Sequence, residues 1–168
     1  MSGDFILINK LKFYYRSPQR GEIAVFSHPS ATSGTFVKRI IAMPGDRIAI
    51  KADEIYINGK KLDRRLVTDP HGSDGHEYYL EHNGPSVYRV RYNPNHFFRG
   101  DLAEKKLASN QYFVLGDNRD YSYDSRFWGT VPLENFIGSA VWVWFSYTHD
   151  QINQQILWRM QRLLKRIE

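Results

Sequence analysis

Short runs of β-branched and aromatic residues, separated by turn-forming residues, constrain this chain more than any other feature of its sequence. Apolar and polar residues alternate within the runs, with the period of two that is typical of a half-buried strand. The runs lie at residues 5–8, 22–26, 35–41, 47–50, 54–57, 111–115 and 136–145. Aromatic residues make up 15% of the chain, and these residues favour pleated surfaces. The pattern predicts a meander of short antiparallel strands.

One tight turn and one change in amino-acid composition divide the chain further. Asn58-Gly59 predicts a two-residue hairpin turn, because both residues tolerate positive φ. From about residue 66 to 106 the chain is rich in Asp, His, Gly, Asn and Pro, with strand-like pieces only at 77–81 and 87–92. We interpret residues 52–108 as an inserted β-rich subdomain. Residues 1–51 and 109–150 then form one β core.

The spacing of apolar residues changes at the end of the chain. Apolar residues between 151 and 168 recur three or four apart, and basic residues accompany them, which predicts a C-terminal amphipathic helix. Its cations could approach anionic lipid headgroups, or its apolar stripe could pack on the β core. The predicted fold class is mainly β, with antiparallel strands in a barrel-like or sandwich core, a β-rich insertion and this helix.

Composition excludes several classes of function. The chain has no cysteine, so it holds no disulfide and no thiolate metal site. No run approaches the roughly 18 to 20 apolar residues of a spanning helix. The net charge of +5 permits attraction to nucleic acid or to an anionic membrane surface. A nucleic-acid binder of the OB type would need aromatic and basic residues on one face, whereas alternation in residues 87–92 puts them on opposite faces. Nucleic acid is therefore not a predicted partner.

Lys38 is the first candidate for chemistry. Its neighbours Phe36, Val37, Ile40 and Ile41 are apolar, so the lysine amine could lie in a low-dielectric environment. Burial disfavours the ammonium form and lowers the pKa of a lysine, which makes the neutral amine available as a base near neutral pH. The alternative is that Lys38 is an ordinary strand residue that faces solvent.

A dense polar stretch at residues 116–129 is the second candidate. It follows an apolar strand and begins and ends with glycine. A loop of this kind, if buried, must satisfy its polar groups internally, which favours pairing of its Asp and Arg side chains. A solvated turn or a cation-binding loop are the alternatives, but the two arginines in the stretch would compete with a metal for the carboxylates.

These two stretches resemble the type I signal peptidase family, the bacterial leader peptidases. Phe-Val-Lys-Arg at 36–39, followed by Met-Pro-Gly-Asp at 43–46, is similar to the general-base motif of that family. Gly-Asp-Asn-Arg-x-x-Ser-x-Asp-Ser-Arg at 116–126 is similar to its terminal motif. Residues 3–10 and 20–26 fit the strands that follow its nucleophile.

The resemblance implies a serine endopeptidase with a Ser/Lys dyad that removes signal peptides from exported preproteins. Lys38 would be the general base, and Ser122 would hydrogen-bond and orient its amine. No metal or organic cofactor is implied. The family places its catalytic domain on the periplasmic or extracytoplasmic face of the bacterial inner membrane, so preprotein signal peptides and the membrane surface are the implied partners.

The resemblance also assigns supporting and substrate-binding residues. Arg39 would pair with Asp117, and Asp124 with Arg126, to hold the strand and the polar loop together. Shallow apolar pockets for small side chains would be lined by Ile6, Val25, Phe36 and Val37. For Ile6 and Val25, a plain core role is the alternative.

One departure from the family affects the expected activity. The nucleophilic serine of the family precedes the segment that matches residues 3–10, in a Ser-Met-x-Pro-Thr type motif, and the nucleophile is absent from this chain. The abrupt start suggests an N-terminal truncation, and we expect the chain alone to be inactive. A non-catalytic peptide-binding relative and a pilin or conjugation-type processing peptidase are the alternative functions.

Overall fold

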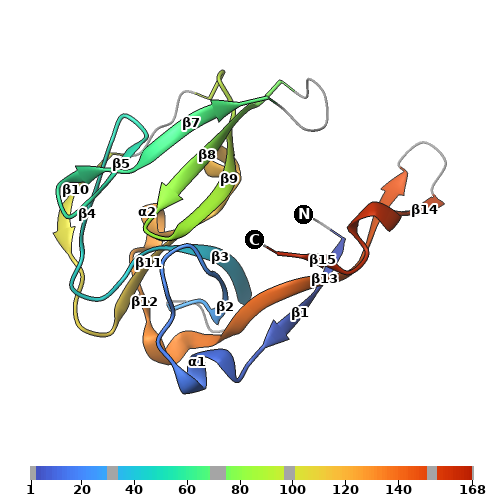
Figure 1. The fold of residues 1–168 in the computed structure, drawn as a ribbon, viewed down its shortest axis with the longest axis horizontal. Helices are drawn as coiled ribbons and strands as arrows, with labels where there is room; N and C mark the ends of the chain where they lie inside the picture. Colours follow the sequence, from blue (N-terminus) through green and yellow to red (C-terminus); the bar gives the residue numbers. More distant parts are fainter. Residues whose placement is uncertain (1–2, 30–33, 69–74, 97–100, 151–154, 168) are drawn as a thin grey trace.

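The computed structural model describes residues 3–29, 34–68, 75–96, 101–150 and 155–167. Nearly all of the regular structure is strand, and the helices are single turns (Figure 1). The strands are β1 (Asp4–Asn9), β2 (Ile23–Ser27), β3 (Thr35–Ala42), β4 (Arg47–Lys51), β5 (Glu54–Ile57), β6 (Lys60–Lys61), β7 (Asp63–Val67), β8 (Glu77–Asn83), β9 (Ser86–Tyr92), β10 (Leu102–Lys106), β11 (Gln111–Leu115), β12 (Val131–Pro132), β13 (Phe136–Asp150), β14 (Gln155–Trp158) and β15 (Lys165–Arg166). The helical turns are α1 (Lys12–Tyr15), η1 (Arg119–Tyr121), α2 (Ser125–Trp128), η2 (Leu133–Asn135) and η3 (Met160–Arg162). Among these described helices, none has the length and apolar character that crossing a bilayer requires.

The largest sheet has the strand order β1-β13-β2-β3-β11-β12, and its pairs are antiparallel. The prediction of a mainly β, antiparallel fold is confirmed. A closed barrel is not formed, because β1 and β12 end the sheet without pairing with each other in the described part of the chain. The long strand β13 runs past the body of the molecule and carries β14 as an arm (Figure 1).

Two smaller sheets complete the structure, with the orders β10-β4-β5-β6 and β7-β8-β9. The hairpin predicted at Asn58-Gly59 is confirmed: it joins β5 to β6, and both residues have positive φ, 53° and 76°. β7 and β10 were not predicted, because their sequences are largely polar and exposed and show little apolar alternation. Pairing with β8 and β4 makes strands of them.

The core consists of two apolar clusters on opposite faces of β3 and β11. Ile41, Phe113 and Leu115 belong to one cluster, while Ile40 and Val114 belong to the other. Both strands are therefore buried on two sides, which gives the centre of the fold a sandwich character. The first cluster also contains β5 and β9 residues, so the packing crosses the predicted boundary of the 52–108 insertion. The division into a core and an inserted subdomain stays a prediction.

The C-terminal amphipathic helix predicted over residues 151–168 is wrong for the described residues 155–167. Residues 155–158 pair with the end of β13, residues 160–162 make one 3-10 turn, and residues 165–166 pair with Trp142 and Val143. The reason is tertiary: β13 offers unpaired backbone groups along its edges, and inter-strand hydrogen bonds to them replace those of a helix. Four apolar residues of the expected helix, Ile156, Met160, Leu163 and Leu164, are between 45% and 68% exposed. Residues 151–154 and 168 lie outside the described residues.

Candidate active site

Lys38 and Ser122 meet at the centre of the largest sheet. The Lys38 amine donates a hydrogen bond of 2.7 Å to Ser122 Oγ, across 84 positions of sequence. Lys38 extends from β3, and Ser122 follows the 3-10 turn η1 in the polar loop. Gly116 allows this approach, because a Cβ at that position would lie 2.2 Å from Ser122 Oγ.

Burial sets the acidity of Lys38. Burial lowers the pKa of the Lys38 amine below its ordinary value of 10.5, and the Arg126 guanidinium lowers it further. The carboxylates of Asp124 and Asp117 oppose this shift without cancelling it. The fully solvent-facing alternative does not hold, since Lys38 is half-buried and the adjacent Arg39 is only 3% exposed. A lowered pKa makes the neutral amine, which can accept a proton, more accessible than in a solvated lysine.

Arg39 ties β3 to the polar loop. Its guanidinium donates two hydrogen bonds to the Asp117 carboxylate, of 2.8 and 2.7 Å, and a third to the Gly21 carbonyl of 2.6 Å. The Tyr88 ring lies under the guanidinium, 4.1 Å from its carbon. A bidentate pair fixes orientation as well as distance. Lys38 therefore extends from a strand whose next residue is anchored to the loop that holds Ser122.

Asp124 organises the far end of the loop. The carboxylate is completely buried and accepts hydrogen bonds from Arg126 Nε (2.8 Å) and from the Gly116 amide (3.0 Å). It also accepts from the Arg126 amide and so caps the single turn α2. Ser125 Oγ, next in sequence, accepts from the Val114 amide of β11 at 3.0 Å. These bonds close the loop back onto the strand from which it starts.

A cavity of about 400 Å³ opens beside Lys38. Ile6 of β1 and Val37 of β3, two of the four residues expected to bind substrate, line it, and their role in binding stays a prediction. Val25 and Phe36 are not among its lining residues. Val25 is buried in β2 at 1% exposure, and the Phe36 ring packs against Phe26, with ring centroids 6.2 Å apart. The remaining lining comes from Asp4, Ile23, Lys38, Arg39, Gly116, Asp117, Val143, Arg162 and Ile167.

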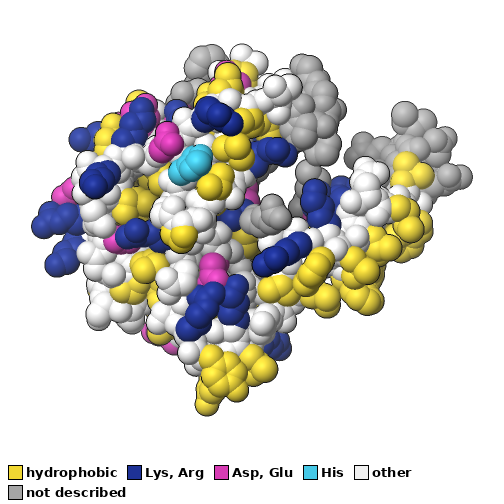
Figure 2. Space-filling model, viewed as in Figure 1, with side chains coloured by type: hydrophobic (Ala, Val, Ile, Leu, Met, Phe, Trp, Pro, Cys, Tyr) yellow, Lys and Arg dark blue, Asp and Glu magenta, His cyan; other side chains and the backbone are white. Residues whose placement is uncertain are grey.

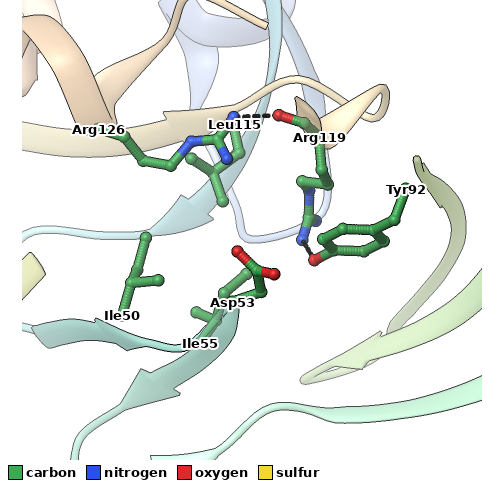
Figure 3. A pocket seen from close by; sticks show the side chains of 7 residues that line it. All are labelled: Ile50, Asp53, Ile55, Tyr92, Leu115, Arg119 and Arg126. Carbon is green, nitrogen blue, oxygen red and sulfur yellow. Dashed lines mark hydrogen bonds between the residues drawn. The ribbon is translucent and has the colours of Figure 1, made fainter. Parts of the chain in front are cut away.

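A buried ion pair that was not predicted from the sequence lies behind the loop. Arg119 and Glu81 are 2% and 1% exposed, and the guanidinium donates to both carboxylate oxygens. Figure 3 shows the Arg119 guanidinium pointing to the Tyr92 hydroxyl, while Arg126 reaches the Arg119 carbonyl from the other side. Arg119 stood inside the recognised motif, but Glu81 lies in a strand where nothing local distinguishes a buried carboxylate from an exposed one.

Within the described ranges, no three His, Asp or Glu side chains gather in the way that a metal site requires. The site holds a half-buried amine, a hydroxyl in hydrogen-bond contact with it and two Arg–Asp pairs. Such an arrangement suits proton transfer to and from a nucleophile.

Comparison with known proteins gives consistent results. Residues 1–145 match the family model described as signal peptidase, peptidase S26. The chain is 39% identical over 156 residues to signal peptidase I of Rickettsia typhi, covering 85% of this chain and 58% of that protein. It is 31% identical over 175 residues to signal peptidase I of Pseudomonas fluorescens, covering 90% and 62%. The chain thus spans about three fifths of the length of these relatives.

Among solved structures, the crystal structure of a signal peptidase I from Enterococcus faecalis V583 is similar, with a TM-score of 0.45 and 24% identity. That similarity covers 74% of this chain and 97% of the other.

Proposed function

Since the chain belongs to the signal peptidase family, peptidase S26, we propose that its protein is a serine endopeptidase that removes signal peptides from exported preproteins. The observation that carries the proposal is the 2.7 Å hydrogen bond between the half-buried Lys38 amine and Ser122. Burial lowers the pKa of this amine, and a base near neutrality is what a Ser/Lys mechanism needs.

In the proposed mechanism the neutral Lys38 amine takes the proton from the hydroxyl of the nucleophilic serine as that oxygen attacks the scissile carbonyl. The resulting ammonium then gives the proton to the leaving amine. Ser122 accepts a hydrogen bond from Lys38 and is 8% exposed, so we assign it the orienting role. The nucleophilic serine is proposed to lie outside residues 1–168, and residues 1–168 alone are expected not to cleave.

The cavity beside Lys38 is the proposed place for the residues that precede the scissile bond. Val37 and Ile6 line it, and Val37 is 43% exposed, so it presents an accessible apolar surface. Apolar walls of this kind discriminate by excluding bulk, which favours small side chains such as alanine. Val25 and Phe36 are proposed to act from behind this surface, as packing that keeps β2 and β3 in place.

The test is cleavage of a signal-peptide substrate by the natural full-length protein and by residues 1–168. Cleavage by the full-length protein after a small residue supports the proposal. If the peptide binds to both proteins and neither cuts it, the protein is a peptide-binding relative. A strong preference for pilin-type substrates over secreted preproteins would instead indicate a specialised processing peptidase.

Ser122→Ala is expected to lower kcat/KM about 10- to 100-fold, because the Lys38 amine loses the hydroxyl that orients it. The measurement is steady-state cleavage by the full-length protein. Ser109→Ala, at an exposed position before β11, serves as the control and should leave the rate unchanged. Equal rates for Ser122→Ala and the unaltered protein would remove Ser122 from the mechanism.

We further propose that the arm of the molecule contacts the membrane surface from which preproteins emerge, on the extracytoplasmic side of the bacterial inner membrane. Figure 2 shows hydrophobic side chains gathered along this arm, over β1, β13 and β14. Eight large hydrophobic residues of this part of the chain are each between 41% and 68% exposed: Phe5, Leu7, Trp142, Trp144, Ile156, Leu157, Trp158 and Met160. Trp is typical of membrane–water interfaces, and the exposed Lys165 and Arg166 nearby add attraction to anionic lipid.

Replacing Trp144 and Trp158 together by Ser is expected to weaken binding to vesicles of phosphatidylglycerol and phosphatidylcholine about 100-fold. The basis is that burying one such side chain is worth roughly 1.5 to 3 kcal/mol. Sedimentation with the vesicles measures the loss. Leu66→Ser is the control, because Leu66 is 60% exposed in β7, which belongs to the separate β7-β8-β9 sheet. Equal binding by the double variant and the control would contradict the assignment.

A further inference from the structure

We propose that the buried pair Glu81–Arg119 is a positioning pair, which sets the polar loop and through it the place of Ser122 Oγ against the Lys38 amine. The inference rests on the proposed function. It assigns a role to a residue of β8, 38 positions from its partner and outside both recognised motifs.

The pair is more completely buried than Lys38 and Ser122 are: Arg119 is 2% exposed and Glu81 1%, whereas Ser122 is 8% exposed and Lys38 is half-buried. Each nitrogen of the Arg119 guanidinium donates a hydrogen bond: the group donates to both Glu81 oxygens, to the Tyr92 hydroxyl at 3.0 Å and to the Gly116 carbonyl at 3.2 Å. Removing two ions from water is costly, and an apolar pair of similar volume is often as stable or more so. Stability alone therefore does not explain the pair, whereas its directed bonds fix one geometry of the loop.

The pair sits where β9 and the loop join. The Arg91 amide donates to the Asp117 carbonyl at 2.9 Å, and the Asn93 amide donates to an Asp120 carboxylate oxygen. Arg91 also forms a parallel bridge with Asn118. The loop is thus held along residues 117–120 by the β8–β9 hairpin, with Glu81 supplying the charge at the centre of this contact.

Two short paths lead from Arg119 to Ser122. Its guanidinium holds the Gly116 carbonyl, and Gly116 packs directly on the Ser122 side chain, with 2.2 Å between Oγ and the position a Cβ would take. Its own carbonyl accepts from the Arg126 guanidinium (Figure 3). The same guanidinium also donates to the Ser122 carbonyl at 3.4 Å. A shift of Arg119 therefore moves the backbone on both sides of Ser122.

The decisive variant replaces both ions, Glu81→Leu with Arg119→Met, which removes the pair without leaving a buried charge. A purely structural pair would be replaced without loss. If the pair positions Ser122, the double variant keeps a melting temperature close to that of the unaltered protein, yet its kcat falls about 10- to 100-fold with KM little changed. Arg119→Lys is the second variant: it keeps the charge but loses the planar fork, and the same loss in kcat is expected.

A second readout does not depend on cleavage. In residues 1–168 with isotope-labelled lysine, NMR follows the titration of Lys38, which should move back toward the ordinary lysine value in both variants as the loop loosens. Glu104→Gln, which breaks the exposed pair between Glu104 and Arg47, is the matched control and should change neither readout.

An unchanged kcat together with an unchanged Lys38 titration in the stable double variant would overturn the proposal. If that variant does not fold, Arg119→Lys decides by the same two readouts. If the unaltered full-length protein fails to cleave any signal peptide, the proposed function fails, and the Lys38 titration alone then decides whether the pair positions the loop.

Discussion

Lys38→Ala in the full-length protein is expected to lower kcat/KM by about 10²- to 10⁴-fold, the range that a positioned general base contributes. The amine donates a hydrogen bond of 2.7 Å to Ser122 Oγ. Lys38→Arg is expected to be as inactive as the alanine variant, because a guanidinium stays protonated and cannot accept a proton. Lys105→Ala, on the exposed strand β10, is the control and should retain the full rate.

The same amine fixes the direction of the pH dependence. Burial lowers the pKa of Lys38 below 10.5, and the base acts only when it is neutral. Activity should therefore rise with pH through this lowered pKa and be lost as the pH falls below it. A rising limb centred at or above 10.5 in the pH profile of kcat/KM would show that Lys38 is not the base, as would substantial activity in Lys38→Ala.

Asp124→Asn is expected to produce the largest loss of stability. The fully buried carboxylate pairs with Arg126, which is 14% exposed, and it also accepts from the Gly116 amide. Removing one partner of a buried pair leaves an uncompensated charge and typically costs about 3 to 5 kcal/mol. For a domain of this size we expect the melting temperature to fall by about 6 to 20 °C.

Thermal unfolding of residues 1–168 checks this result without any substrate. Asp63→Asn is the matched control, since Asp63 is exposed in β7 and the same change should leave the melting temperature within a degree or two. If Asp124→Asn has the same melting temperature as the control, the Asp124–Arg126 pair does not hold the loop. The variant should also be a poorer catalyst, because Asp124 holds Gly116 directly and holds Ser122 through Arg126.

Local sequence was sufficient for most of the strands and for one turn. The runs at 35–41, 111–115 and 136–145 became β3, β11 and β13, because alternation and β-branched residues act through the backbone of the run itself. The Asn58-Gly59 hairpin formed for the same reason: its two residues accept positive φ wherever they stand. The Lys38 motif and the polar loop at 116–129 were likewise visible as stretches of unusual composition.

Tertiary structure decided what depends on partners far away in the sequence. Residues 155–158 had helical periodicity but became a strand, because the edge of β13 supplied backbone hydrogen bonds. β7 and β10 lacked a strand pattern and took their form from β8 and β4. The largest sheet stayed open, since closure depends on whether its two end strands meet and not on the sequence of either.

The features of the site can also be separated into those determined by the sequence and those determined by the tertiary structure. The sequence by itself determined that Lys38 stands among apolar neighbours and that residues 116–126 carry several charges which need partners. Only the folded chain decided that Lys38 lies 2.7 Å from Ser122, that Ile6 and Val37 share its cavity, and that Glu81 neutralises Arg119. The physical reason is that propensity and turn chemistry act over a few residues, whereas the burial and pairing of a charge depend on which distant side chain the fold brings against it.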